Sequence, residues 1–524
     1  MKYPIGIQTF SQIIENGFVY VDKTDMVYSL ATEGKVYFLS RPRRFGKSLL
    51  LSTLRSYFEG KKDLFKGLKI DALEKDWHQH KVFHIDFNGT NFTVPGALNM
   101  KIEGYIHDWE KEYDITPEVD FGLGSRFEKI LKVASEKSGR GVVVLIDEYD
   151  KPLLDVLERD PDLLDRNREI LKAFYSVFKQ SDAYLRFVFL TGVTKFSQIS
   201  VFSGFNQPLD ISMSEKYESL CGITEEELLS YFAEPIREMA DSEGCTEEEM
   251  QKLLKQRYDG YHFGKTMTDI YNPFSLLNAF YNKDIRDYWF ASGTPTYLIR
   301  LMNHFNEGID ELTGKYYSLD EFVNYKADIE YPLPMIYQSG YLTIKDYERD
   351  MGLFLLDFPN NEVKSGFLTM VATNYLQCEA TLDSWIRQAV FALKKGRLEE
   401  FRKMLTSFLA SIPYTMRRKE DERERERYFQ YTFYLLLRLM SVYTVSLERE
   451  QSEGRVDCIV ETPQYVYIFE FKLDGTAAEA LKQIEDKGYA RPYGNDTRTI
   501  YKIGVSFSSQ TGTIEDWQEI TSPR

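Results

Sequence analysis

One segment near the start of the chain constrains the fold more than any other. A β-rich run at residues 35–39 leads into a loop at 40–45, and Gly46, Lys47 and Ser48 then open a helix with an apolar face. A buried strand, a tight loop and a helix N-terminus are the parts of a phosphate-binding loop, because their N–H groups converge on one point. In this arrangement Lys47 reaches the β- and γ-phosphates of a nucleotide, and the Ser48 hydroxyl ligates Mg²⁺.

The tripeptide Gly-Lys-Ser or Gly-Lys-Thr alone is weak evidence for a phosphate-binding loop. The elements before and after it decide which copy is one. A second copy at residues 264–266 follows a helical stretch and a turn, with no strand to aim a loop, and is predicted to be structural. In the first copy Arg41 stands where such loops usually carry a glycine, and Pro42 restricts Arg41 to extended geometry. Arg43 and Arg44 add positive charge beside the phosphates. The alternative is a basic surface turn.

A second segment, residues 141–152 (GVVVLIDEYDKP), supplies the acids that a nucleotide site requires. Its aliphatic run predicts a buried strand whose end presents Asp147 and Glu148. We expect Asp147 to hold the Mg²⁺ ion with its water shell and Glu148 to polarise the attacking water, with Asp150 as a weaker candidate for either role. The strand at 186–195 ends in Thr191 and Thr194, one of which could sense the γ-phosphate. Ordinary strand-ending threonines are the alternative.

The first 215 residues alternate β-rich runs with helical stretches. The strand candidates are residues 36–39, 82–87, 142–146, 185–190 and, more weakly, 209–213. This alternation predicts an α/β fold, with a parallel sheet covered by helices on both faces.

Beyond residue 215 the pattern changes. Residues 216–414 form a mostly helical middle region, with helices at 225–242, 247–258 and 383–409 and short β-like pieces at 341–345 and 352–358. The mixed-charge run at 417–427 (RRKEDERERER) marks the start of a third domain, a C-terminal α/β module at 415–524.

The C-terminal module carries a second chemical pattern in residues 454–457 (GRVD) and 465–473 (YVYIFEFKL). Side chains alternate along a strand, so Glu470 and Lys472 share one apolar face while aromatic residues cover the other. A strand that is apolar on both faces is central, and burying a carboxylate and a lysine there is costly unless a metal ion or charge partner is present. Asp457, at the start of the preceding strand, can approach them across a hairpin.

Two carboxylates that bind Mg²⁺, here Asp457 and Glu470, suffice for phosphodiester hydrolysis when Lys472 orients water and stabilises negative charge. Helices are expected at residues 428–440 and 477–487, and the second of these carries Gln483. The alternative is a structural salt bridge between Glu470 and Lys472 at a sheet edge.

Taken together, these motifs resemble bacterial AAA-ATPase-like proteins fused to a PD-(D/E)xK nuclease-like domain. The most specific element is RPRRFGKS at residues 41–48, joined by IGIQTF, LTGVTKFS, YDGYHF and the C-terminal GRVD and FEFKLDG motifs. The resemblance covers nearly the whole chain. It implies an additional-strand, AAA-like P-loop ATPase domain at 1–215 and a nuclease-superfamily domain with intact acids and lysine. In that family the arginine-rich loop is the normal form.

The composition of the chain limits its mode of nucleic-acid binding, its metal sites and its location. The net charge of −16 opposes a hold on nucleic acid by bulk electrostatics, so any contact must use local basic patches or depend on Mg²⁺. The four cysteines form no CxxC pair, which fits a reducing cytosol and argues against a cysteine zinc site. The start lacks a signal peptide pattern, and the apolar segment 428–447 contains charged and polar residues. We therefore expect a cytoplasmic protein without a membrane span.

Two functions of different classes follow. The first is an ATP-dependent or ATP-regulated nuclease, with ATP and Mg²⁺ as cofactors and DNA or RNA as substrate. The alternative is a nucleotide-switched regulatory protein whose C-terminal domain binds a partner without cleaving it, or is vestigial. The sequence leaves open whether the chain forms a homo-oligomer.

Overall fold

The structure is a computed structural model, and it divides the chain into two compact units, residues 1–363 and 364–524. It describes residues 1–117, 122–157, 159–195, 208–292, 312–323, 332–376, 382–411, 432, 435–436, 438–440, 446–451 and 454–522. The charged run at 417–427 and the predicted domain boundary at 414–415 lie outside these residues. The predicted helix at 428–440 lies partly outside them.

The first unit is built on a parallel five-stranded sheet in the order β2-β3-β4-β1-β5. The predicted strands are all present, at Val36–Ser40 (β1), Val82–Asp86 (β2), Val142–Asp147 (β3), Leu185–Gly192 (β4) and Leu209–Asp210 (β5). All six residues of β3 are buried, because a central parallel strand is covered on both faces. β4 lies between β1 and β3, which confirms the additional-strand arrangement.

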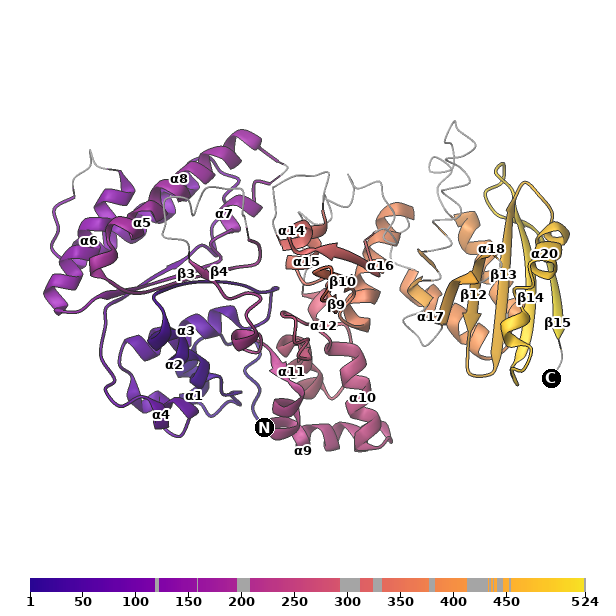
Figure 1. The fold of residues 1–524 in the computed structure, drawn as a ribbon, viewed down its shortest axis with the longest axis horizontal. Helices are drawn as coiled ribbons and strands as arrows, with labels where there is room; N and C mark the ends of the chain where they lie inside the picture. The colour runs from indigo at the N-terminus through magenta and orange to yellow at the C-terminus, as the bar shows by residue number, and fades with distance from the viewer. Residues whose placement is uncertain are drawn as a thin grey trace. The chain divides into compact units, whose positions relative to one another are not determined.

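Helices cover both faces of this sheet, as predicted. Figure 1 shows α5, α6 and α8 on one face and α2 and α3 on the other. The helices of this part are Phe10–Glu15 (α1), Thr24–Glu33 (α2), Lys47–Phe58 (α3), Lys69–Leu73 (α4), Ala97–Glu112 (α5), Leu123–Ser138 (α6), Lys151–Leu154 (α7) and Pro161–Gln180 (α8). Since parallel strands end at the same edge, the loops after β1, β3 and β4 meet there.

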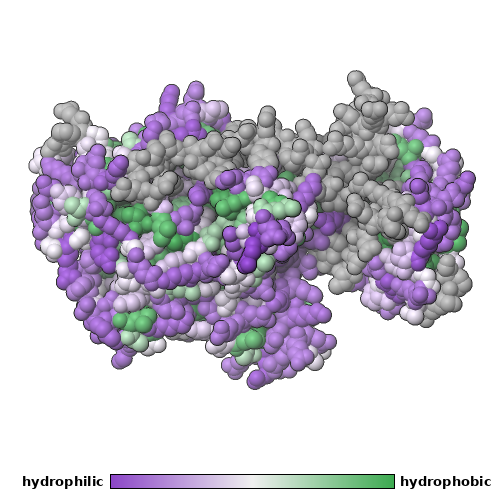
Figure 2. Space-filling view, in the orientation of Figure 1, coloured by the Kyte–Doolittle hydropathy of each residue, from purple (hydrophilic) through white to green (hydrophobic). Residues whose placement is uncertain are grey.

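The rest of the first unit is mostly helical. Its helices are Glu225–Glu243 (α9), Glu247–Tyr258 (α10), Pro273–Asn282 (α11), Tyr288–Ala291 (α12), Leu319–Val323 (α14), Leu333–Gln338 (α15) and the start of Asn361–Leu376 (α16). Capping boxes fix the starts of α9 and α10 at Thr224 and Thr246. In Figure 2 the visible surface over α9 and α10 is largely hydrophilic.

Two small antiparallel sheets complete this region. Ile223–Thr224 (β6) pairs with Ile270–Tyr271 (β7), and a three-stranded sheet has the order β8-β10-β9. The predicted β-like pieces are confirmed as Thr343–Glu348 (β9) and Leu353–Asp357 (β10), while Lys315–Ser318 (β8) was not predicted.

The second unit has a five-stranded sheet in the order β11-β12-β13-β14-β15, in which only the β13–β14 pair is parallel. Its strands are Ser446–Gln451 (β11), Gly454–Glu461 (β12), Tyr465–Leu473 (β13), Thr499–Phe507 (β14) and Ile514–Ser522 (β15). Ala477–Asp486 (α20) packs on β13 and β14 from one face. At Gly504 a Cβ would stand 2.1 Å from the Ala477 carbonyl oxygen, so this close helix–strand approach requires glycine.

The single helix predicted at residues 383–409 is wrong in one respect. The structure has two helices there, Leu382–Lys394 (α17) and Leu398–Ser411 (α18). Gly396 between them adopts left-handed backbone with φ 69°, which ends the first helix. Both helices face the sheet from the side opposite α20: the Tyr467 hydroxyl donates to the Leu393 carbonyl oxygen, and the Phe401 and Phe469 rings lie 6.1 Å apart.

None of the helices in the described ranges is both long and apolar enough to cross a bilayer.

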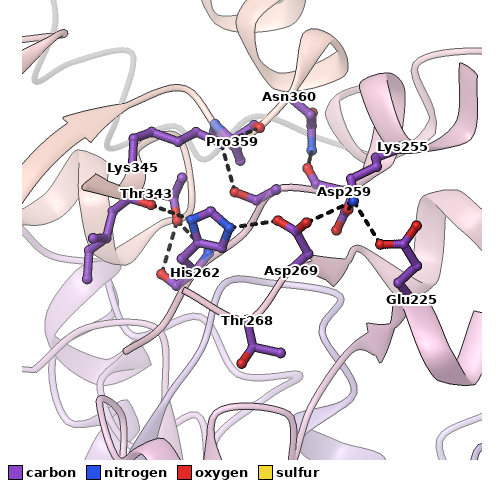
Figure 3. Close-up of polar contacts among 12 residues, drawn as sticks. Glu225, Lys255, Asp259, His262, Thr268, Asp269, Thr343, Lys345, Pro359 and Asn360 are labelled. Atoms are coloured by element: carbon purple, nitrogen blue, oxygen red, sulfur yellow. Dashed lines mark hydrogen bonds and ion pairs between the residues drawn. The ribbon is translucent and has the colours of Figure 1, made fainter. Parts of the chain in front are cut away.

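A cluster of charged side chains surrounds Asp259 at the end of α10 (Figure 3). Asp259 is only 1% exposed, and its Oδ2 lies 3.8 Å from the Lys255 ammonium. Lys255 is engaged more closely by Asp269 at 2.9 Å and Glu225 at 2.8 Å. Burial raises the pKa of Asp259 to about 7, and the neighbouring Asp269 carboxylate adds to the shift. Ionisation of Asp259 therefore lowers the stability of the folded protein.

We predict that Asp259→Asn stabilises the protein increasingly as the pH rises. The pKa of Asp259 in the folded protein, about 7, lies above its ordinary value of 3.8, so the folded state holds this proton more tightly than the unfolded chain. The bound proton therefore stabilises the folded state. This stabilisation is complete at low pH and is lost as the pH rises through 7. The stability difference between variant and wild type should grow by about 2 kcal/mol between roughly pH 5.5 and 8.5.

Urea denaturation of both proteins across this range measures the difference. Asp350→Asn, in an exposed turn, is the control and should show no such trend. A difference between Asp259→Asn and wild type that does not change with pH would contradict the assignment.

Candidate functional sites

The loop between β1 and α3 has the shape of a phosphate-binding loop. Arg44 and Gly46 adopt left-handed backbone, with φ 68° and 92°. α3 begins at Lys47, so the free N–H groups of its first turn face the loop. The buried Lys47 ammonium donates to the carbonyl oxygens of Arg41 at 3.1 Å and Pro42 at 3.2 Å. A phosphate oxygen is a stronger partner than a carbonyl, so Lys47 can exchange these bonds for phosphate contacts.

Arg41, at the position of the usual first glycine, points away from the nucleotide side. Its guanidinium is 1% exposed and donates to the backbone carbonyl oxygens of Ser212 at 2.7 Å and Tyr217 at 3.3 Å. It also lies 4.0 Å from the centre of the Phe263 ring, a cation–π contact. Arg41 therefore fixes the start of the loop to the segment after β5.

Arg43 and Arg44 are exposed, as a phosphate-contacting role requires. The Arg43 carbonyl oxygen accepts a hydrogen bond from the Trp289 indole N–H at 3.0 Å. The Arg44 guanidinium lies 5.2 Å from the centre of the Phe274 ring. Both side chains line the cavity described below, so their charge is available to a bound anion.

The predicted acids lie at the same edge of the sheet. Asp147 ends β3 and is 2% exposed, and the Glu148 Oε1 atom lies 3.9 Å from the Lys47 ammonium. Burial raises the pKa of Asp147 to about 6, while a hydrogen bond with Ser48 opposes the shift. A hydroxyl beside a buried carboxylate is a set of oxygen donors that suits Mg²⁺, and a cation there would balance the buried charge. The residues present fit the expected ion, and its ligation by Ser48 and Asp147 stays a prediction.

The third acid of the motif has a structural task. Asp150 is fully buried and accepts hydrogen bonds through Oδ2 from the Val193 N–H at 3.0 Å and the Thr194 N–H at 2.7 Å. The Thr194 hydroxyl also donates to Asp150, at 2.8 Å. The Thr191 hydroxyl has no hydrogen-bond partner within the described part of the chain. Of the two threonines proposed as γ-phosphate sensors, Thr191 therefore has the uncommitted hydroxyl.

A cavity of about 1070 Å³ opens beside the loop. Lys47, Ser48 and Glu148 line it, and this volume is slightly above the usual range for small-molecule sites. Residues 4–8, before α1, and Phe274 of α11 complete its wall. Sequence reasoning did not assign these wall residues to the site. The IGIQTF motif is a signal for residues 5–8, and no motif indicates Phe274, because the position of these residues depends on packing between distant segments.

The second copy of the motif is structural, as predicted. Residues 264–266 form a bend and turn with no strand before them and no helix after them. The Thr266 hydroxyl donates to the Glu218 carboxylate at 2.6 Å, and the Lys265 ammonium donates to the Tyr347 hydroxyl at 3.1 Å.

In the second unit, β13 is a central strand, so the sheet-edge interpretation is wrong. Glu470 is 2% exposed, and its Oε1 atom lies 3.7 Å from the Lys472 ammonium. Gln483 of α20 joins the two: its amide oxygen accepts from Lys472 at 2.6 Å, and its amide N–H donates to Glu470. The face shared by Glu470 and Lys472 is thus the face that α20 covers.

Asp457 lies in β12, one residue before Cys458, which pairs with Phe469 of β13. The Asp457 side chain is outside what the structure describes, so its approach to Glu470 stays a prediction. Among the described residues no group of three or more histidine, cysteine, aspartate or glutamate side chains is arranged to hold a metal ion. Glu470 is the described carboxylate of the expected Mg²⁺ site. A buried acid flanked by an amide and a lysine fits such a site once a second acid joins it.

Family models match both units of the chain. A model described as predicted AAA-ATPase matches residues 4–202. A model described as PD-(D/E)XK nuclease superfamily matches residues 424–517. The two matches coincide with the two constellations of side chains described above.

Similarity to one bacterial protein extends over the full length. An uncharacterized protein in the vnfD 5′ region of Azotobacter chroococcum is 36% identical over 522 residues, which cover 98% of each chain. Among solved structures, Cdc6p from Pyrobaculum aerophilum shares 12% identity with a TM-score of 0.26, covering 68% of this chain and 95% of that one. The Aeropyrum pernix Orc1 protein in complex with DNA shares 11% identity with a TM-score of 0.22, covering 90% and 92%.

We predict that Arg41→Lys destabilises the first unit although it keeps the charge. Lysine cannot reach several backbone carbonyls at once or stack its head group flat on Phe263, so buried acceptors lose their donors. The expected loss is about 2 kcal/mol, seen as a melting temperature lower by about 3 °C. The matched control, Arg43→Lys in the exposed part of the same loop, should melt like the wild type. Equal melting temperatures for Arg41→Lys and Arg43→Lys would contradict the structural role of Arg41.

Proposed function

We propose an ATP-regulated nuclease activity for this chain, which belongs to the predicted AAA-ATPases that carry a C-terminal domain of the PD-(D/E)XK nuclease superfamily. The first unit would bind and hydrolyse ATP with Mg²⁺, and the second would cleave phosphodiester bonds in DNA or RNA. The observation that carries the ATP part of the proposal is the placement of Lys47, Ser48, Asp147 and Glu148 at one edge of a parallel sheet, beside a cavity of about 1070 Å³. The nuclease part rests on buried Glu470 beside Lys472, in the region that matches the nuclease superfamily.

At the nucleotide site each side chain has a task that its position supports. Lys47 exchanges its bonds to loop carbonyls for bonds to the β- and γ-phosphates, which positions the phosphates against the N-terminus of α3. Ser48 and Asp147 would hold Mg²⁺, which when bound neutralises the phosphate charge. Glu148 is 18% exposed and lines the cavity, so its carboxylate can take a proton from the attacking water.

At the second site Lys472 is 31% exposed while Glu470 is buried. Lys472 can therefore meet a substrate phosphate and stabilise the charge that develops on it, and Gln483 holds its ammonium in place. Glu470 and Asp457 would hold Mg²⁺, which supplies an activated water and a Lewis acid for phosphodiester hydrolysis. The net charge of −16 means that nucleic acid is held by such local contacts rather than by overall attraction.

We predict that two substitutions at the loop separate ATP binding from ATP hydrolysis. Lys47→Ala removes the phosphate contact and should weaken ATP binding by about a hundredfold or more. Glu148→Gln keeps the shape but cannot accept the proton, so it should bind ATP normally and turn it over about a hundredfold more slowly. Titration with a fluorescent ATP analogue and a phosphate-release assay measure the two effects.

The chain offers a matched control for Lys47. Lys265→Ala alters the same tripeptide pattern in the structural copy and should leave ATP binding and turnover unchanged. If Lys47→Ala hydrolyses ATP like the wild type, the site is misassigned.

We predict that Glu470→Gln and Lys472→Met each lower nuclease activity by about a hundredfold. The assay incubates the full chain with mixed single- and double-stranded DNA and RNA and Mg²⁺, with and without ATP, and an EDTA control removes the metal. Lys482→Met, on the exposed side of α20, is the control and should cleave normally.

Cleavage by Glu470→Gln at the wild-type rate would refute the assignment of the second site. ATP turnover without cleavage of any substrate by the wild type would instead favour the alternative function, a nucleotide-switched regulatory protein whose C-terminal domain binds without cutting.

A further inference from the structure

The phosphate-binding loop is connected to a buried carboxylate in α16. Trp289 of α12 donates its indole N–H to the Arg43 carbonyl oxygen at 3.0 Å, and its backbone N–H donates to Glu362 Oε1 at 2.6 Å. The other oxygen of Glu362 accepts from the Ser275 hydroxyl at 2.7 Å. Trp289 is thus held between the loop and the first turn of α16.

Glu362 is an unusual residue for this position, because it is 1% exposed and the donors that hold it are neutral. Burial raises its pKa to about 7. A buried carboxylate is costly, and losing either donor would raise that cost, so its two hydrogen bonds fix the geometry tightly. Packing alone could have been supplied by an apolar residue at lower cost. The contact to Trp289 therefore points to a positioning role.

A second connection reaches the same turn of α16 through the YDGYHF segment, residues 258–263. At the loop end, Phe263 lies against the Arg41 guanidinium at 4.0 Å, and the Tyr261 and Phe45 rings meet edge to face with centroids 4.8 Å apart. The segment therefore packs against the phosphate-binding loop at two points.

The other end of this segment holds the start of α16 (Figure 3). The Asn360 side-chain amide donates to the Asp259 carbonyl oxygen at 2.8 Å, while its own oxygen accepts from the Val363 N–H at 3.1 Å. The Lys345 ammonium bridges the carbonyl oxygens of Gly260 at 3.0 Å and Pro359 at 2.8 Å. Two separate paths of contacts thus run from the loop to residues 359–363.

The first turn of α16 lies at the point in the chain where the first unit ends and the second begins. α16 spans Asn361–Leu376, and its first three residues belong to the first unit while the rest belong to the second. A change in the loop that is passed to residues 360–362 is therefore passed to the helix that leads covalently into the nuclease-superfamily unit.

We propose that Glu362 is a positioning residue for the phosphate-binding loop, acting through Trp289, and that the first turn of α16 registers nucleotide occupancy. This inference rests on ATP binding at Lys47. Phosphate binding reorders the loop, the Arg43 carbonyl moves with it, and the Trp289–Glu362 contact carries the movement to α16. Chains of packed side chains and hydrogen bonds of this kind can carry coupling between two sites.

The experiment measures ATP affinity, ATP turnover and backbone hydrogen exchange of residues 358–370 in the full chain, with and without ATP and Mg²⁺. Trp289→Phe removes the indole donor and keeps the ring, so it should weaken ATP binding by about tenfold, the equivalent of one hydrogen bond, with kcat nearly unchanged. Glu362→Ala should do the same or more. We expect ATP to protect residues 358–370 from exchange in the wild type. In both variants this protection should be smaller, because only the contacts of the YDGYHF segment still connect the loop to this turn.

Glu362→Gln is the conservative variant, because its amide oxygen can still accept from the Trp289 N–H, and it should restore most of the affinity and the protection. Asp350→Ala, in an exposed turn, should behave like the wild type. If Glu362→Ala does not fold, Trp289→Phe decides, since it leaves the backbone contact to Glu362 in place.

Wild-type affinity and wild-type exchange protection in Trp289→Phe would overturn the inference. So would a wild-type chain that binds ATP without any change in the exchange of residues 358–370. Failure of the proposed function looks different, because the wild type would then bind ATP no better than Lys47→Ala.

Discussion

The first unit is organised around the burial of opposite charges at one edge of a parallel sheet. The Lys47 ammonium, 4% exposed, is 3.9 Å from Glu148, and Asp147 beside them is buried as well. Removing such charges from water costs several kcal/mol per ion, so they persist only where fixed dipoles and partners compensate. The loop carbonyls supply the partners of Lys47, and the Ser48 hydroxyl supplies a partner of Asp147. The buried Arg41 guanidinium, in turn, holds the loop in place.

The sheet and the identity of this edge could be predicted from the sequence because both follow from local patterns. Buried parallel strands are continuous apolar runs, and residues 142–146 are such a run, so their carboxyl end had to meet the end of β1. The role of Arg41 could not be predicted in this way. Its partners, Ser212 and Tyr217, lie about 170 residues further along the chain, and nothing near Arg41 indicates them. The cavity wall at residues 4–8 and Phe274 depends on distant packing for the same reason.

In the C-terminal unit, too, local patterns predict some features of the site while others depend on distant packing. Strict alternation along β13 was enough to place Glu470 and Lys472 on one face, and the two apolar faces indicated a central strand. The contact of Gln483 with both side chains required the register of α20 on the sheet, which sequence spacing does not specify. An amide can accept from the lysine and donate to the carboxylate at once, so it keeps both charges in place without neutralising either. That arrangement suits a site whose acid and lysine must act on a substrate.

The most direct test of this account is a crystal structure of the chain with a non-hydrolysable ATP analogue and Mn²⁺ in place of Mg²⁺. Mn²⁺ gives an anomalous signal that locates the ion independently of the nucleotide density. We expect the phosphates in contact with Lys47, and one ion held between the phosphates, Ser48 and Asp147. An analogue bound elsewhere, or an ion that contacts neither Ser48 nor Asp147, would contradict it.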